Sequence, residues 1–129
     1  MNIKFISLFG ALALIALVGG FALLDSRSED SVLDLSDQAT VNVVLTDHGF
    51  DPNHFRIKKG TEVVFSTTIG KQFWPASNIH PSHGLYPAFD PKRPLEPDEA
   101  WSFSFDNVGT WGLHDHLRSY YTGVIEVIE

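Results

Sequence analysis

Two pairs of histidines are the residues of this 129-residue chain best suited to chemistry. A His-Pro-Ser-His motif contains His80 and His83, and a His-Asp-His motif contains His114 and His116. Neutral imidazole binds borderline transition metals, so two close pairs predict a metal site. The chain has no cysteine, and its one methionine is the first residue. A copper centre built on cysteine and methionine therefore cannot form.

An all-imidazole site suits Cu(II) or Zn(II), and the Irving–Williams order makes copper the expected cofactor, with zinc as the alternative. Zinc with three histidines and a water would be a hydrolytic site. Residues two apart on a strand share a face, so His114 and His116 can chelate one ion if the strand continues through them. The non-functional alternative is that the four histidines bond to loop carbonyls or face solvent. His48 and His54 lie in separate turns and are not expected to be ligands.

Two acidic residues near the histidine pairs are expected to support the site without binding the metal. Asp115 is expected to orient a ligating imidazole; a direct oxygen ligand and a solvated charge are the alternatives. Asp90 is expected to cap a turn before a proline rather than bind metal. No serine–histidine–acid order and no phosphate-binding glycine loop is evident, so we expect no catalytic residues, and enzymatic activity is less expected than binding.

The remaining sequence predicts strands that would carry these histidines. From residue 39 onward, apolar residues alternate with polar ones in short runs separated by turn residues, which is typical of a β-sandwich. The clearest runs are 41–46, 55–57, 61–68, 101–106, 110–113 and 123–128. Residues 69–97 contain six of the seven prolines and are expected to form a long loop with a functional role.

The N-terminal part predicts export. Residues 5–24 form an uncharged apolar run about long enough to cross a bilayer as a helix. Lys4 precedes the run and acidic residues follow it, which favours an extracytoplasmic location for the rest of the chain. We expect a signal anchor in residues 1–24 and an acidic flexible tether in residues 25–38. A cleaved signal peptide, which would leave a secreted or periplasmic domain, is the alternative.

The order of these signals resembles the cupredoxin family. Residues 51–65, with a lysine–glycine turn at 59–60, are similar to two cupredoxin strands. Residues 109–127 resemble the C-terminal metal-binding loop and last strand. The resemblance covers residues 39–129. It implies an all-β, Greek-key sandwich with a metal held at one end by loop residues.

The departures from the cupredoxin pattern lie at the copper ligands. Counting back from the last strand, Asp115 stands where the family's cysteine is expected and Tyr120 stands near its second histidine. Phe73 stands near the upstream histidine position, where it is expected to shield the site from water. The mononuclear blue copper site of the family is therefore absent.

The two histidine pairs instead resemble motifs of multicopper oxidases. Residues 109–116 are similar to the oxidase motif Gly-x-Trp-x-x-His-Cys-His, and residues 80–83 match its His-Pro-x-His. Such oxidases need several domains, and this chain has room for one. The chain also looks similar to a group of small bacterial cupredoxin-like proteins with Trp-Pro-Ala-Ser-Asn, His-Pro-x-His and His-Asp-His-Leu motifs.

The sequence thus predicts a membrane-tethered, extracytoplasmic copper-binding protein that stores, delivers or buffers copper. An electron-transfer cupredoxin or oxidase-type module is one alternative, and a metal-free interaction domain is another. The expected partners are the metal ion, the membrane, and a redox or copper-delivery protein. A net charge of −7 without a basic stripe argues against nucleic acid, so we expect no nucleic-acid partner.

Overall fold

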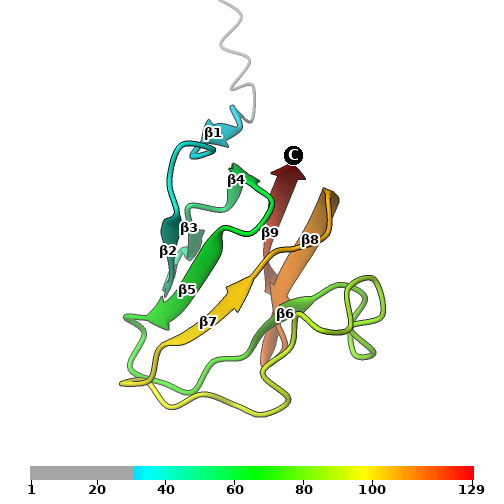
Figure 1. Cartoon of the computed structure of the whole chain (residues 1–129). Coiled ribbons are helices and arrows are strands. Elements are labelled where there is room, and N and C mark those ends of the chain that lie inside the picture. Colours follow the sequence, from blue (N-terminus) through cyan, green and yellow to red (C-terminus); the bar gives the residue numbers. More distant parts are fainter. Residues whose placement is uncertain (1–30) are drawn as a thin grey trace, which may run out of the picture.

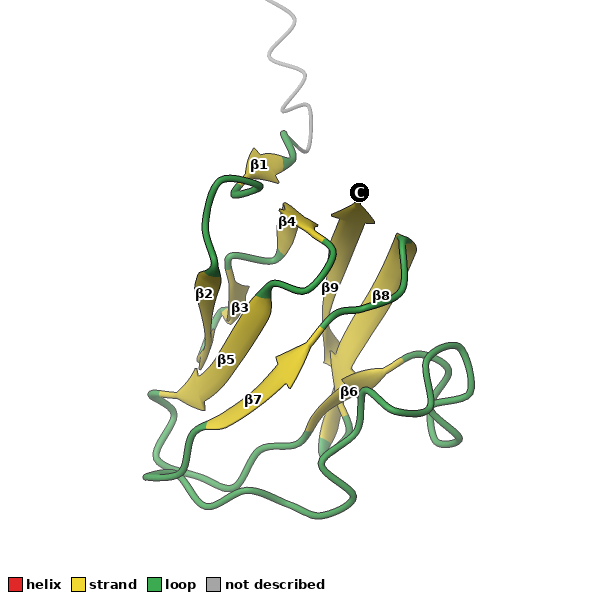
Figure 2. Cartoon of the chain, in the orientation of Figure 1, coloured by secondary structure: helices red, strands yellow, loops and turns green. Residues whose placement is uncertain are grey.

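The computed structural model describes residues 31–129, which form a sandwich of two β-sheets joined by loops (Figure 1). Strands and loops make up all of this part of the chain (Figure 2). Within it, no helix is long and apolar enough to span a bilayer. The membrane segment predicted for residues 5–24 lies outside the described residues.

Each sheet combines strands that are distant in sequence. The first sheet has the order β1 (Leu33–Asp34), β4 (His54–Lys58), β9 (Arg118–Ile128), β8 (Gly109–Asp115) and β6 (Pro75–Ser77). The second has the order β3 (Gly49–Asp51), β2 (Thr40–Thr46), β5 (Glu62–Thr67) and β7 (Trp101–Ser104). Parallel pairs such as β4–β9 and antiparallel pairs such as β8–β9 both occur. The chain therefore passes repeatedly from one sheet to the other.

The predicted alternation of apolar and polar residues is what forms the core. In β2, Val41, Val43 and Leu45 are buried while the residues between them are exposed or half-buried. In β5, which pairs with β2 in parallel, Val63 and Phe65 are buried in the same way. Burying side chains of this size contributes about 1.5–3 kcal/mol each. The all-β sandwich predicted from the sequence is confirmed.

The long loop predicted for residues 69–97 contains a strand that the sequence pattern did not indicate. The strand, β6, pairs antiparallel with β8, and Ala76 lies opposite His114. On either side of β6 in the sequence, Phe73 and Leu95 exchange backbone hydrogen bonds of 3.1 and 2.8 Å. Residues 69–97 are therefore attached to the sheet through β6, and the Phe73–Leu95 pair ties the two ends of the loop together. At the other end of the sandwich, β1 forms inside the predicted tether and pairs with β4.

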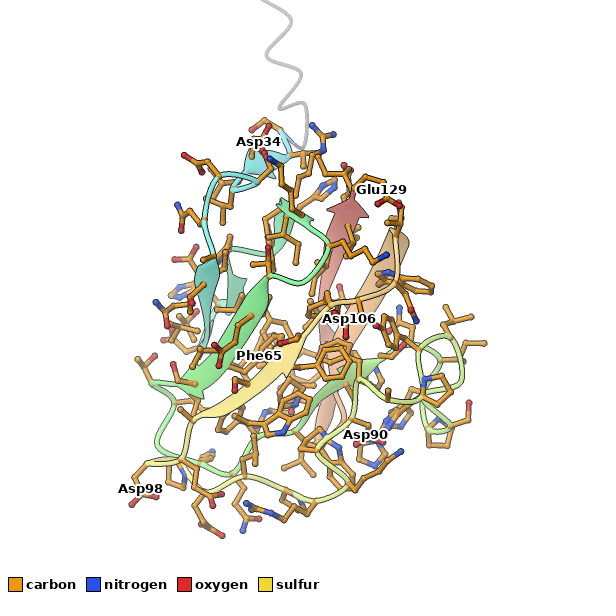
Figure 3. All side chains as sticks on the ribbon, in the orientation of Figure 1. Asp34, Phe65, Asp90, Asp98, Asp106 and Glu129 are labelled. Atoms are coloured by element: carbon orange, nitrogen blue, oxygen red, sulfur yellow. The ribbon has the colours of Figure 1, made fainter. Side chains whose placement is uncertain are left out.

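An aromatic cluster anchors the middle of the same loop. Phe89 is fully buried, and its ring lies 5.0–5.4 Å from the rings of Phe65, Phe103 and Phe105. Its carbonyl accepts a hydrogen bond of 2.9 Å from the backbone N–H of Ser77 in β6. The loop is consequently packed on the end of the sandwich away from β1 and the C-terminus, where Asp90 is labelled in Figure 3.

Candidate metal centre

The two histidine pairs meet at one end of the first sheet. His114 lies in β8, and His116 lies in the turn that follows, with its backbone N–H bonded to the carbonyl of Trp74 at 2.8 Å. β6 pairs with β8, and the loop that leaves β6 brings His80 into contact with His114 and His83 into contact with His116. One ring nitrogen of each of the four histidines lies within 4.8 Å of the others. The structure thus brings together the four histidines that the sequence analysis selected as candidate metal ligands.

Two short contacts link the pairs. His80 Nδ1 lies 3.1 Å from His114 Nε2, and His83 Nε2 lies 2.9 Å from His116 Nδ1. His83 and His114 are buried, His116 is half-buried and His80 is exposed. The cluster therefore has a closed side within the protein and an open side toward solvent.

The two buried imidazoles are each held by a hydrogen-bond partner behind them. His83 Nδ1 lies 2.6 Å from Asp90 Oδ2, and His114 Nδ1 lies 3.1 Å from Asn78 Oδ1. An oxygen that accepts at Nδ1 leaves Nε2 without a hydrogen and free to donate its lone pair. In both histidines, Nε2 is the nitrogen that faces the cluster.

The indole of Trp74 closes one side of the site. Its ring lies 4.4 Å from the ring of His116 and 6.1 Å from that of His83. Its Nε1–H donates to Asp90 Oδ1 at 2.8 Å. Trp74 thus packs against one ligand candidate while it positions the carboxylate that holds another.

Burial and mutual repulsion keep part of the cluster uncharged. Burial, and then the neighbouring His83 and His80, lower the pKa of His114 from 6.5 to about 4. The same causes lower the pKa of His116. Burial opposes the charge of Asp90, but hydrogen bonds from His83, Lys92 and Trp74 outweigh it and lower the carboxyl pKa to about 2. Near neutral pH the site therefore combines unprotonated imidazoles at His114 and His116 with an ionised carboxylate at Asp90.

The low pKa of His114 predicts an acid-sensitive metal-free protein. The unfolded chain, with a pKa near 6.5, binds more protons than the folded chain, with a pKa of about 4, so stability falls as the pH falls through this window. We expect chelator-treated protein to lose on the order of 3 kcal/mol from this group. Urea unfolding at pH 7, 5.5 and 4.5 measures the loss. A His114→Asn variant should show a weaker dependence, and an identical dependence in both proteins would contradict the assignment.

Asp115, the carboxylate predicted to orient an imidazole, has other partners. Its Oδ1 accepts the backbone N–H of Trp74 at 2.7 Å, and its Oδ2 lies 2.8 Å from Arg118 Nε in an ion pair that lacks hydrogen-bond alignment. None of the hydrogen bonds recorded for residues 31–129 joins it to a histidine ring. Its negative charge slightly opposes the lowering of the His116 pKa, while Asp90 contacts an imidazole directly.

The other residues considered from the sequence do not belong to the four-histidine cluster. Phe73 is fully buried and bridges to Leu95, so it belongs to the core beneath the loop; its shielding of the site stays a prediction. His48 and His54 lie outside the four-histidine cluster. His48 is exposed, whereas His54 begins β4 rather than lying in a turn, and it contacts Glu126 at 3.1 Å.

Sequence reasoning did not single out Asn78, and it gave Asp90 only the role of a turn cap. That role is confirmed, because Asp90 Oδ1 accepts the backbone N–H of Lys92 at 2.8 Å. Its contact with His83 crosses a loop of irregular conformation, and the contact of Asn78 with His114 joins residues that are 36 positions apart. No fixed sequence spacing marks such contacts.

Gly112 gives a way to disturb the orientation of His114 without touching a ligand. A Cβ at this position would meet the side-chain nitrogen of Asn78 below van der Waals contact. We expect Gly112→Ala to turn the Asn78 amide away from His114 and to weaken metal binding about 10- to 100-fold, as loss of an outer hydrogen bond does elsewhere. Thr110→Ala, at an exposed position of the same strand, is the control. Competition titration with a copper chelator measures both, and equal affinities would argue against the role of Asn78.

Known proteins share this architecture. No protein-family model and no curated protein sequence matches the chain. Among solved structures, the purple cupredoxin of Nitrosopumilus maritimus is similar over 68% of this chain and 99% of its own, with a TM-score of 0.55 and 12% identity. A mutant plastocyanin of fern is similar over 68% and 100%, with a TM-score of 0.55 and 18% identity. The chain has the cupredoxin fold. The resemblance read from the sequence is confirmed at this level.

A larger copper protein contains the same fold. The Cu-containing nitrite reductase of Thermus scotoductus matches 70% of this chain at 21% identity and a TM-score of 0.57. This chain covers 22% of the length of that reductase. The cupredoxin fold recurs in that enzyme as one part of a longer chain.

The donor set of this cupredoxin domain fits a copper ion. Four nitrogens about 2.0–2.1 Å from a metal are all about 3.4 Å apart in a tetrahedron. In a flattened arrangement, neighbours are about 2.9 Å apart and opposite nitrogens about 4.1 Å. Here the two linking contacts are 2.9 and 3.1 Å, and the whole set extends to 4.8 Å. All four nitrogens lie close enough together for one ion to reach them after small movements of the side chains, and a nitrogen donor set without thiolate suits Cu(II).

Proposed function

We propose that this cupredoxin domain binds one copper ion through His80, His83, His114 and His116, and that it stores, delivers or buffers copper outside the cytoplasm. The observation that carries the proposal is the convergence of four imidazole nitrogens within 4.8 Å. Imidazole nitrogens without a thiolate suit Cu(II), which also leads the affinity order of the divalent metals.

The protonation of the site supports metal binding near neutral pH. Metal must compete with protons for imidazole nitrogen, and the low pKa of His114 and His116 reduces that competition. The hydrogen bonds at Asp90 and Asn78 fix two of the four rings before the metal arrives. A pre-arranged ligand loses less conformational entropy when it binds.

The exposed position of His80 supports transfer of the ion. The other side of the cluster is closed by Trp74 and by the buried histidines. A ligand at the surface gives a donor or acceptor protein a place to exchange the metal. The apolar run at residues 5–24 and the acidic residues after it support a membrane tether that holds the domain on the extracytoplasmic side.

Electron transfer is the second candidate function. The fold favours it, since the plastocyanin and purple cupredoxin matches share this architecture. The ligand set disfavours it, because an all-imidazole site open on one side reorganises more on reduction than a buried thiolate centre. Reversible voltammetry of the copper-loaded protein in the physiological range would revive it.

Metal analysis and Cu(II) EPR of the full-length chain test the proposed function. We expect one equivalent of copper per chain, with hyperfine structure from several nitrogens and no intense blue colour. Zinc in place of copper would move the function toward a structural or hydrolytic site. Absence of both metals would leave a cupredoxin fold used for protein contacts.

A further inference from the structure

We propose that Asp90 is a positioning residue that directs Nε2 of His83 toward the metal and that its charge favours Cu(II) over Cu(I). The inference rests on the proposed copper site, and it assigns a function to a buried carboxylate that is not itself a ligand. The contact behind it is the 2.6 Å pair of His83 Nδ1 and Asp90 Oδ2.

The chemistry of the pair fixes which nitrogen is free. An ionised carboxylate only accepts hydrogen bonds, so the hydrogen of a neutral His83 must sit on Nδ1. Nε2 then carries the lone pair, and it lies 2.9 Å from His116 Nδ1 on the side of the cluster. Both partners are almost fully buried, with side-chain exposures of 4% and 7%, so water does not compete for the contact.

Asp90 is itself held in place. Its Oδ1 accepts from Trp74 Nε1 and from the backbone N–H of Lys92, both at 2.8 Å. These two bonds prevent the carboxylate from rotating away from His83. The Lys92 ammonium lies 3.4 Å from Oδ2, but its side chain is 69% exposed, so solvent screens its charge. The negative charge of Asp90 is therefore directed mainly at the imidazole.

A comparison within the site shows what the charge adds. His114 is oriented by the neutral amide of Asn78, whereas His83 is oriented by a carboxylate. Both partners select a nitrogen and raise the basicity of their imidazole, but the ionised carboxylate does so more strongly, and it alone places a negative charge near the metal. A negative charge stabilises the more highly charged ion, and burial strengthens this effect. Asp90 should therefore favour Cu(II).

Asp90→Asn tests the charge, with Glu126→Gln as the matched control. Glu126 also contacts a histidine, His54, at 3.1 Å, and its loss removes the same charge outside the cluster. We expect Asp90→Asn to lower the ratio of Cu(II) to Cu(I) affinity about 10- to 100-fold. The copper potential should rise correspondingly by about 60–120 mV, at 59 mV per tenfold. Competition titrations and voltammetry measure the two quantities. A shift no larger than that of Glu126→Gln would overturn the role of the charge.

The tautomer of His83 in metal-free, full-length protein tests the positioning separately. ¹⁵N-correlated NMR distinguishes a protonated Nδ1 from a protonated Nε2. We expect His83 to carry its hydrogen on Nδ1 in the native chain and to populate the other tautomer in Asp90→Ala. Protonation on Nε2 in the native chain would overturn the positioning, and this measurement needs no folded variant. If the native chain binds no copper, the proposed function fails, while the tautomer still decides whether Asp90 positions His83.

Discussion

Replacing His114 and His116 together by alanine is expected to abolish tight copper binding. His114, which lies in β8, is the most buried of the four candidate ligands. His116 contacts both His83 and the Trp74 ring. Loss of two of four nitrogens should lower Cu(II) affinity by more than the roughly 10- to 100-fold typical of outer-shell changes. The nitrogen hyperfine structure of the EPR spectrum should disappear with it.

Thermal unfolding gives an independent measure of the same loss. Copper at about 100 times its Kd stabilises the native chain by about 2.7 kcal/mol. For a domain of this size that corresponds to a rise in Tm of roughly 10–20 °C. The double variant should show no rise. A copper-dependent rise that survives in it would mean that the ion binds elsewhere.

Two further variants make this result specific. His48→Ala/His54→Ala removes the same number of histidines outside the cluster and should leave copper binding intact. His80→Ala/His116→Ala removes the two less buried candidates, so it disturbs packing less than any change at His114. If both cluster variants fold and still bind copper as tightly as the control, the four-histidine site is wrong.

The fold and the four candidate ligands could be predicted from the sequence because both leave local patterns. The two-residue alternation of β2 and β5 marks which side chains enter the core. The paired histidines follow spacings that suit chelation, and the C-terminal motif resembles a known metal-binding loop. Each of these signals is contained in a short stretch of consecutive residues.

The supporting contacts of the site could not be predicted, because they depend on how the loop folds. Asp115 is adjacent in sequence to two ligand candidates, which made it the natural choice for the orienting carboxylate. Neighbouring residues in a strand point to opposite faces, however, so its side chain turns toward Trp74 and Arg118. Asp90 contacts His83 seven positions away in the same loop, next to the buried Phe89, and no local sequence pattern marks that contact.

Phe89 connects the stability of the core to the geometry of the metal centre. Its fully buried ring packs among Phe65, Phe103 and Phe105, and the next residue in the chain is Asp90. We expect Phe89→Ala to destabilise the protein by about 3–5 kcal/mol, because it leaves a cavity that the rigid sheets cannot close. Because the loop then loses its anchor, copper affinity should fall as well.

Phe55 is the matched control, since it is a fully buried phenylalanine in β4, away from the loop. Phe55→Ala should lower the free energy of unfolding by a similar amount but leave copper affinity unchanged in the folded fraction. The milder pair Phe89→Leu and Phe55→Leu serves if the alanine variants unfold. Urea unfolding and chelator competition on the four proteins measure both effects. If the Phe89 variants bind copper as tightly as the Phe55 variants, the site holds its geometry without the aromatic anchor. The hydrogen bonds from Trp74 and Lys92 would then suffice to place Asp90.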